Sequence, residues 1–213
     1  MKKLGLLLLA AFVAAPAFAQ HGIDLLLDAE GVRRTGEVTD FSSGTQQITP
    51  DFSNGWGAGA GLNVWLSDRV SIEGKASGFR SRLHVTTVGS DFVGHLDLGH
   101  AQLYPIMAVL QWHPMEHGML RPYIGAGAAH IILQNVNEEI GSSGARGIAF
   151  NDPTGLLLDA GLRIHISNKW DAFGDVRYVP VETHGKTTFP GTDVAIRLEV
   201  KPLIAAFGVA YRF

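Results

Sequence analysis

The chain has 213 residues, of which 46% are hydrophobic and 17% charged, with a formal net charge of −3 and no cysteine. The acidic balance argues against a nucleic-acid partner, and the absence of cysteine suits an oxidising compartment, where a free thiol is a liability. A chain of this length corresponds to one domain by the usual size prior.

The first 19 residues have the pattern of an export signal. Lys2 and Lys3 precede an apolar run, which is followed by Ala17-Phe18-Ala19. A basic start, a short apolar centre and an A-x-A site are the three parts of a secretory signal peptide. The run is too short for a membrane anchor, which needs about 20 apolar residues. We therefore predict a signal peptide at 1–19 and one domain at 20–213.

Eight later segments alternate between apolar and polar residues with a period of two, which is the period of a β-strand. In chain order they are Ile23–Arg33, Gly55–Leu66, Arg69–Phe79, Leu98–His113, Leu120–Ile132, Thr154–Ile166, Trp170–Val181 and Arg197–Phe213.

The connections between these segments alternate in length. Three are short, namely Ser67-Asp68, Pro114–Met119 and Ser167–Lys169, and four are long, namely Arg34–Asn54, Arg80–Asp97, Leu133–Pro153 and Glu182–Ile196. Short turns on one side and long loops on the other are typical of outer-membrane barrels. We therefore predict an all-β fold, an eight-stranded antiparallel up-and-down transmembrane barrel of a Gram-negative-type bacterium. Its short turns would face the periplasm.

The two faces of each predicted strand differ in polarity. In Thr154–Ile166, Leu156, Leu158 and Leu162 share one face, whereas Asp159 and Arg163 share the other. A soluble β-sandwich would bury the apolar face and expose the polar one. A barrel in lipid presents the apolar face to the bilayer and encloses the polar one.

The alternation places ten charged residues inside the barrel, five of each sign. The predicted network consists of Asp28, Glu30, Glu73, Asp159 and Asp175 with Lys75, Arg121, Arg163, Arg177 and Arg212. Unpaired charges in a narrow interior are costly, whereas interleaved charges satisfy one another. We favour a structural role for this network over a functional one, because perturbed charges mark function only probabilistically. Glycines on the inward parity, such as Gly57 and Gly59, are expected to leave room for bulky neighbours.

Aromatic residues collect near the predicted strand ends, as the two interfaces of a bilayer favour. Trp56, Tyr104 and Tyr178 lie towards the loops, and Trp112, Trp170, Tyr211 and Phe213 lie towards the turns. The chain ends on Phe213 with Tyr211 on the same face. We predict that these two residues form an assembly signal read by the barrel assembly machinery.

The last two strands resemble the OmpW family of eight-stranded outer-membrane barrels. The resemblance lies in Asn168-Lys169-Trp170, Asp175-Val176-Arg177-Tyr178, Val200-Lys201-Pro202, Gly208-Val209-Ala210-Tyr211-Arg212-Phe213 and, upstream, Arg121-Pro122-Tyr123-Ile124-Gly125-Ala126-Gly127. It implies a monomer in the outer membrane, in contact with its lipids. It also implies passive uptake of small hydrophobic solutes, through a narrow apolar funnel with a lateral exit into the bilayer.

Two short segments match enzyme motifs. His113-Pro114-Met115-Glu116-His117 spells the inverted zinc-protease pattern, but that motif needs a helix, and Pro114 falls inside it. His165-Ile166-Ser167-Asn168 is similar to the H-x-S-N segment of lipid A deacylases, although here it falls at a predicted periplasmic turn. We expect no catalytic site, no metal and no cofactor.

Eight strands enclose an interior that side chains just fill, so a wide aqueous pore is not expected. The uptake of small apolar molecules is therefore the leading prediction for function. The alternative is a non-transporting structural or surface-interaction barrel that acts through its four long loops. A deacylase-like enzyme is the weakest of the three interpretations.

Overall fold

A computed structural model of the chain describes residues 22–34, 41–43, 46–52, 54–88, 93–115, 117–134, 146–150, 152–189 and 192–213. Within these ranges, side chains are described at 22–33, 54–80, 102–115, 117–132, 152–181 and 201–213. The predicted signal peptide lies outside the described residues, and its cleavage stays a prediction. The described part contains no helix long and apolar enough to cross a membrane.

Eight antiparallel strands close into a barrel, as the sequence predicted. The strands are β1 (Ile23–Arg34), β4 (Gly55–Trp65), β5 (Val70–Val88), β6 (Val93–Trp112), β7 (Leu120–Gln134), β9 (Thr154–Ser167), β10 (Trp170–Tyr178) and β13 (Pro202–Arg212). They are hydrogen-bonded in the order β5-β4-β1-β13-β10-β9-β7-β6, and a further pairing of β5 with β6 closes the ring.

Short connections gather at one end of the barrel, which we call the turn end. They join β4 to β5, β6 to β7, and β9 to β10. Asp24 near the start of β1 pairs with Arg212 near the end of β13, so the first and last strands meet at this end. In the connection after β6, Gly118 has a φ of 120°, a conformation that side chains other than glycine rarely adopt.

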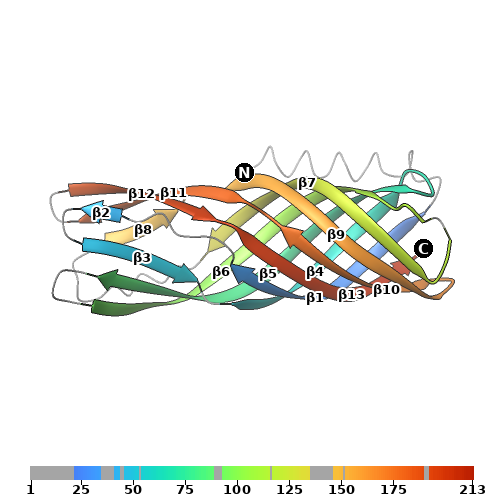
Figure 1. Cartoon of the computed structure of the whole chain (residues 1–213), viewed down its shortest axis with the longest axis horizontal. Coiled ribbons are helices and arrows are strands. Elements are labelled where there is room, and N and C mark those ends of the chain that lie inside the picture. The colour runs from blue at the N-terminus through green and yellow to red at the C-terminus, as the bar shows by residue number, and fades with distance from the viewer. Residues whose placement is uncertain are drawn as a thin grey trace.

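The opposite end, which we call the loop end, carries strands where the sequence predicted loops. They are β2 (Phe41–Ser43), β3 (Gln46–Phe52), β8 (Arg146–Phe150), β11 (Val181–Phe189) and β12 (Thr192–Val200). β2 and β3 extend the barrel sheet along β5, while β8, β11 and β12 form a separate three-stranded sheet. Figure 1 shows these elements prolonging the barrel beyond its closed part.

The predicted strand bounds were therefore wrong at the loop end. β5 and β6 continue to Val88 and from Val93, through most of the predicted loop Arg80–Asp97. The predicted last strand, Arg197–Phe213, is two strands separated at Lys201. Antiparallel ladders between β5 and β6 and between β11 and β12 run through these segments, which the sequence analysis assigned to long connections.

The faces of the closed part are sorted as the sequence predicted. On β9, Leu156 is 74% exposed and Leu158 57% exposed. Asp159 and Arg163, which lie on the opposite face of the strand, are buried. The last strand repeats the pattern, with Phe207 exposed and Ala206 and Gly208 buried. An apolar outer surface over a polar interior is what a lipid environment selects.

Interior glycines lie where bulky side chains cross the lumen. A Cβ on Gly59 would lie 2.5 Å from Lys75 Cε and 2.7 Å from Asp28 Oδ1. One on Gly161 would lie 2.4 Å from the Tyr123 ring. These contacts leave no room for a larger residue, so the glycines allow the charged and aromatic groups to meet in a barrel of only eight strands.

Candidate functional site

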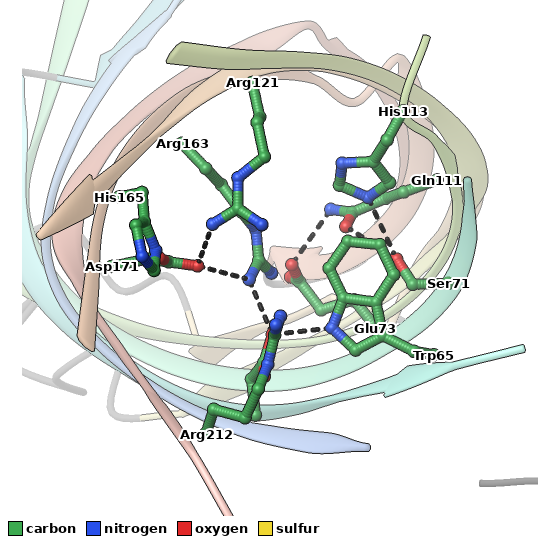
Figure 2. Close-up of polar contacts among 11 residues, drawn as sticks. Trp65, Ser71, Glu73, Gln111, His113, Arg121, Arg163, His165, Asp171 and Arg212 are labelled. Atoms are coloured by element: carbon green, nitrogen blue, oxygen red, sulfur yellow. Dashed lines mark hydrogen bonds and ion pairs between the residues drawn. The ribbon is translucent and has the colours of Figure 1, made fainter. Parts of the chain in front are cut away.

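The turn end of the barrel interior is organised around Asp24, which lies on β1 and is 1% exposed. Its carboxylate accepts a hydrogen bond of 2.7 Å from Trp65 Nε1 and lies 2.7 Å from Arg163 Nη1 and 2.9 Å from Arg212 Nε. One carboxylate thus pairs with two arginines and accepts from an indole. Figure 2 shows Trp65, Arg163 and Arg212 converging inside the ring of strands.

A second carboxylate, Asp171 at the start of β10, lies at the same end. It lies 2.7 Å from Arg121 Nη2 and 2.9 Å from His165 Nδ1, and 4.0 Å from Arg163 Nη1. Arg163 therefore links Asp24 and Asp171 into one network, which we call the lower charge layer.

His113 follows the end of β6 and packs beside the lower charge layer. Its ring lies 4.5 Å from that of Trp65 and 5.3 Å from that of Tyr123, and its Nε2 is 3.1 Å from Ser71 Oγ. The ring acts here as a packing element between these two aromatic side chains.

Above the lower layer, two cations each bridge several carboxylates. Lys75 Nζ lies 2.5 Å from Asp28 and 2.6 Å from Glu30. Arg177 Nη2 lies 2.7 Å from Glu73 and 2.8 Å from Asp175, and its Nε lies 3.6 Å from Asp159. We call this set the upper charge layer.

Neutral donors complete the upper charge layer. Gln111 donates hydrogen bonds of 3.0 Å to Glu73 and 2.9 Å to Asp159. Tyr123 donates one of 3.2 Å to Asp175. Because these groups cross-link carboxylates from different strands, the layer forms a polar plug across the lumen.

All ten charged residues predicted to face the lumen contribute to these two layers. Arg121 and Arg212 are partly exposed at the turn end, and the other eight are buried. The predicted balance of five charges of each sign was incomplete, because Asp24 and Asp171 also point inward and are buried. Both share the parity of residues that were assigned inward, Asp28 on β1 and Asp175 on β10, so the alternation was sufficient to find them. Seven carboxylates therefore meet five Lys and Arg side chains.

An apolar layer fills the lumen on the loop side of the charges. Its buried members come from six strands and the segment that joins β10 to β11, and they are Phe79, Met107, Val109, Ala129, Ile131, Leu157, Val179, Val181 and Ile204. Val32 and Leu103 pack against it. The sequence alone did not reveal these residues as a layer, although they share the inward parity.

The change from charged to apolar falls at one level around the barrel. The inward position changes from Glu30 to Val32 on β1 and, two strands away, from Lys75 through Ser77 to Phe79 on β5. At the end of β10 the change is from Arg177 to Val179, just beyond the strand. The interior thus has two regions with opposite chemistry and a sharp boundary between them.

The comparisons with known proteins agree with this architecture. The sequence profile of the OmpW family matches residues 28–213. The chain belongs to the OmpW family. Outer membrane protein W of Vibrio cholerae is 26% identical over 215 residues, which cover 98% of this chain and 97% of that protein. Outer membrane protein AlkL of Ectopseudomonas oleovorans is 26% identical over 151 residues, which cover 71% of this chain but only 60% of AlkL.

Solved structures show the same fold. The crystal structure of OprG from Pseudomonas aeruginosa has a TM-score of 0.77 at 17% identity, covering 90% of this chain and 96% of OprG. The solid-state NMR structure of AlkL in DMPC lipid bilayers has a TM-score of 0.62 at 20% identity, covering 92% of each chain. This OmpW-family barrel is therefore a protein of the outer membrane, where its apolar outer surface contacts lipid.

The wall of this OmpW-family barrel is interrupted beside the charge boundary. The ladder between β5 and β6 runs to Ala76 opposite Ile106 and resumes at Phe79 opposite Leu103. The unpaired stretch is Ser77-Gly78 facing Tyr104-Pro105. Pro105 has no N–H with which to donate a ladder bond. We call this interruption the seam.

The outer face of the seam is covered by one aromatic side chain. A Cβ on Gly78 would lie 3.3 Å from the Tyr104 ring, so that ring rests over the glycine. The Tyr104 hydroxyl donates a hydrogen bond of 2.9 Å to Gln102 on the same strand. This hydrogen bond lies along β6, so the contact across the seam is the packing of the Tyr104 ring against Gly78.

The structure places the two enzyme-like segments at the turn end. His113 is buried, whereas His117 of the same segment is exposed. His165 contacts Asp171 and has a side chain 43% exposed. Among the described residues, no three His, Asp or Glu side chains come together in a way that would hold a metal ion.

The predicted assembly residues lie together on the outer surface at the turn end. The Tyr211 ring lies 4.9 Å from that of Trp170 and 5.3 Å from that of Phe213, which is 74% exposed. Lys169 Nζ lies 5.7 Å from the centre of the Tyr211 ring. Such an aromatic cluster suits the membrane interface.

Proposed function

We propose that this barrel mediates passive uptake of small hydrophobic molecules. The solute enters at the loop end, passes into the apolar layer and leaves sideways through the seam into the bilayer. The observation that carries the proposal is the coincidence of two features. The interior changes from apolar to charged at the level where the wall loses its hydrogen bonds.

The two interior regions give an apolar solute one favourable route. Moving apolar surface from water into an apolar environment releases about 25 cal/mol per Å², so the apolar layer attracts such a molecule. The charge layers oppose further passage, because the solute would have to separate buried ion pairs. The remaining path leads through the wall.

The seam suits a lateral exit better than a second interruption in the wall. The β9–β10 ladder ends at Leu158 opposite Tyr178, and the chain beyond it passes through Pro180. There the inner side is tightly packed, since a Cβ on Gly155 would lie 2.5 Å from Val181 Cγ1 and 2.6 Å from the Pro180 carbonyl oxygen. At the seam the inward residues are Ser77 and Pro105, and outside it lies the Tyr104 ring.

The experiment restores the missing donor at the seam. Pro105→Ala returns an N–H to β6, and we expect it to complete the ladder and reduce octane uptake by Gram-negative cells towards that of cells lacking the gene. Pro122→Ala is the matched control, because Pro122 lies in the wall at the turn end, within the intact β7–β9 ladder. Heat-dependent gel migration checks that both variants fold. Equal uptake by both variants and the parent would contradict exit through the seam.

A second candidate function is a non-transporting barrel that acts through its loop end. The buried, side-chain-filled apolar layer favours it, because a solute has to displace side chains such as Met107, which is 2% exposed. Methionine is flexible enough to move aside, which keeps transport feasible. Parent cells that take up octane no faster than cells without the gene would support this second candidate.

The remaining predictions are part of the same proposal. We propose that the barrel is a monomer without enzymatic activity and that the barrel assembly machinery recognises Tyr211 and Phe213. The separation of His113 and His117 between interior and surface supports the absence of protease chemistry. Deleting Phe213 should lower the folded yield in cells, and a yield equal to that of Ser167→Ala would contradict the assembly role.

A further inference from the structure

Ser77 lies in the interior with a hydroxyl that has no hydrogen-bond partner among the described residues. The residue is 6% exposed. The residue that pairs with it on β4 is Gly59, which has no side chain. The register on the other side places it opposite Pro105, which has no N–H. A buried hydroxyl without a partner destabilises a fold, so its presence at the seam calls for a ligand.

Ser77 also marks the boundary between the two regions. Lys75, two residues earlier on the same face, belongs to the upper charge layer, while Phe79, two residues later, belongs to the apolar layer. The hydroxyl therefore lies where the charged and apolar regions meet, at the seam, where the β5–β6 ladder lacks two pairs.

A second hydrogen-bond donor lies at the boundary between the charged and apolar regions. Arg177 Nη1 donates to Met107 Sδ at 3.9 Å. Thioether sulfur is a weak acceptor, so this N–H is poorly satisfied, although the other side of the guanidinium binds Glu73 and Asp175. Both groups at the boundary that lack a good partner can donate a hydrogen bond.

We infer that the preferred solutes are apolar molecules that carry one hydrogen-bond acceptor, such as a medium-chain ketone, aldehyde or ester, and that Ser77 binds this acceptor at the seam. The inference rests on the proposed function and narrows its substrate class. The apolar body occupies the apolar layer while the carbonyl oxygen accepts from the Ser77 hydroxyl. A hydrocarbon of the same length gains the first interaction without the second.

The test compares two solutes of equal chain length, octane and 2-octanone, in cells that carry the parent, Ser77→Ala or Ser77→Thr. A neutral hydrogen bond of typical net strength changes an equilibrium constant by roughly two- to tenfold. We therefore expect Ser77→Ala to reduce the uptake of 2-octanone relative to octane by that factor. Ser77→Thr keeps the hydroxyl and should retain the parent ratio.

A stability measurement separates binding from a structural role. Because Ser77→Ala removes an unpartnered hydroxyl, the purified barrel should melt at the parent temperature or above it. A lower melting temperature, or an equal fall in the uptake of both solutes, would overturn the inference by showing that the hydroxyl supports the fold. An unchanged solute ratio would overturn it too.

The outcomes also distinguish this inference from the proposed function. Faster octane uptake by parent cells than by cells without the gene supports uptake itself, whatever Ser77→Ala does to the ratio. If parent cells take up neither solute faster, the proposed function fails and the inference fails with it.

Discussion

The two regions of the barrel interior differ in how they resist change. In the charge layers, every ionised group needs partners on other strands, as Arg177 does with Glu73, Asp159 and Asp175. In the apolar layer, contacts such as those of Met107 and Leu157 are non-directional and can be remade after a side chain moves. A small barrel can thus combine a rigid charged region at one end with an apolar region whose packing can rearrange at the other.

The largest expected effect is on the upper charge layer. Arg177→Ala leaves three buried carboxylates without their arginine, and breaking a buried pair from one side costs about 3–5 kcal/mol. We expect the free energy of unfolding in urea to fall by about 5 kcal/mol. Arg212→Ala is the control, because its side chain is 35% exposed and water can replace it. Similar losses for both variants would show that burial of Arg177 is unimportant.

A smaller difference in stability is expected between variants of the lower and of the upper charge layer. Asp24→Asn removes the charge that faces Arg163 and Arg212, and we expect a loss of about 3 kcal/mol. Asp159→Asn relieves a site where three carboxylates share Arg177, and we expect a loss below about 1 kcal/mol.

Urea unfolding of the two amide variants measures both values under one condition. The order matters more than the values, because it reports the surplus of carboxylates in the upper layer. A greater loss for Asp159→Asn than for Asp24→Asn would mean that the carboxylates around Arg177 are not in excess.

Enlarging the space in the apolar layer should lower the stability of the barrel and raise the uptake of apolar solutes. Leu157 is 0% exposed, and Leu157→Ala removes packing at a cost of about 2 kcal/mol, the low end for such changes because Met107 can relax into the space. The cavity also widens the path for solutes, so octane uptake should rise. Asp24→Asn, with comparable destabilisation, should leave octane uptake unchanged. An equal change in uptake for both variants would mean that stability alone controls it.

Much of this division could be predicted from the sequence. Alternation within single strands places Arg163 and Asp159 inside and Leu158 outside, because the period of a strand is fixed at two. The missing parts depend on neighbouring strands. Identifying the seam requires the strand register that sets Ser77 opposite Pro105. Identifying the apolar layer requires the positions of seven segments along the barrel axis to be compared. The strands at the loop end fall in segments that the alternation of short and long connections led us to assign to loops.

The central claim is that the interior admits apolar molecules and excludes polar ones. The most direct measurement is the uptake of octane and of a sugar of similar size by the same cells, with and without the gene. Because charged side chains fill the turn end of an eight-stranded barrel, the protein should speed the entry of octane and leave that of the sugar unchanged. Faster entry of the sugar would contradict the account by revealing an open aqueous channel.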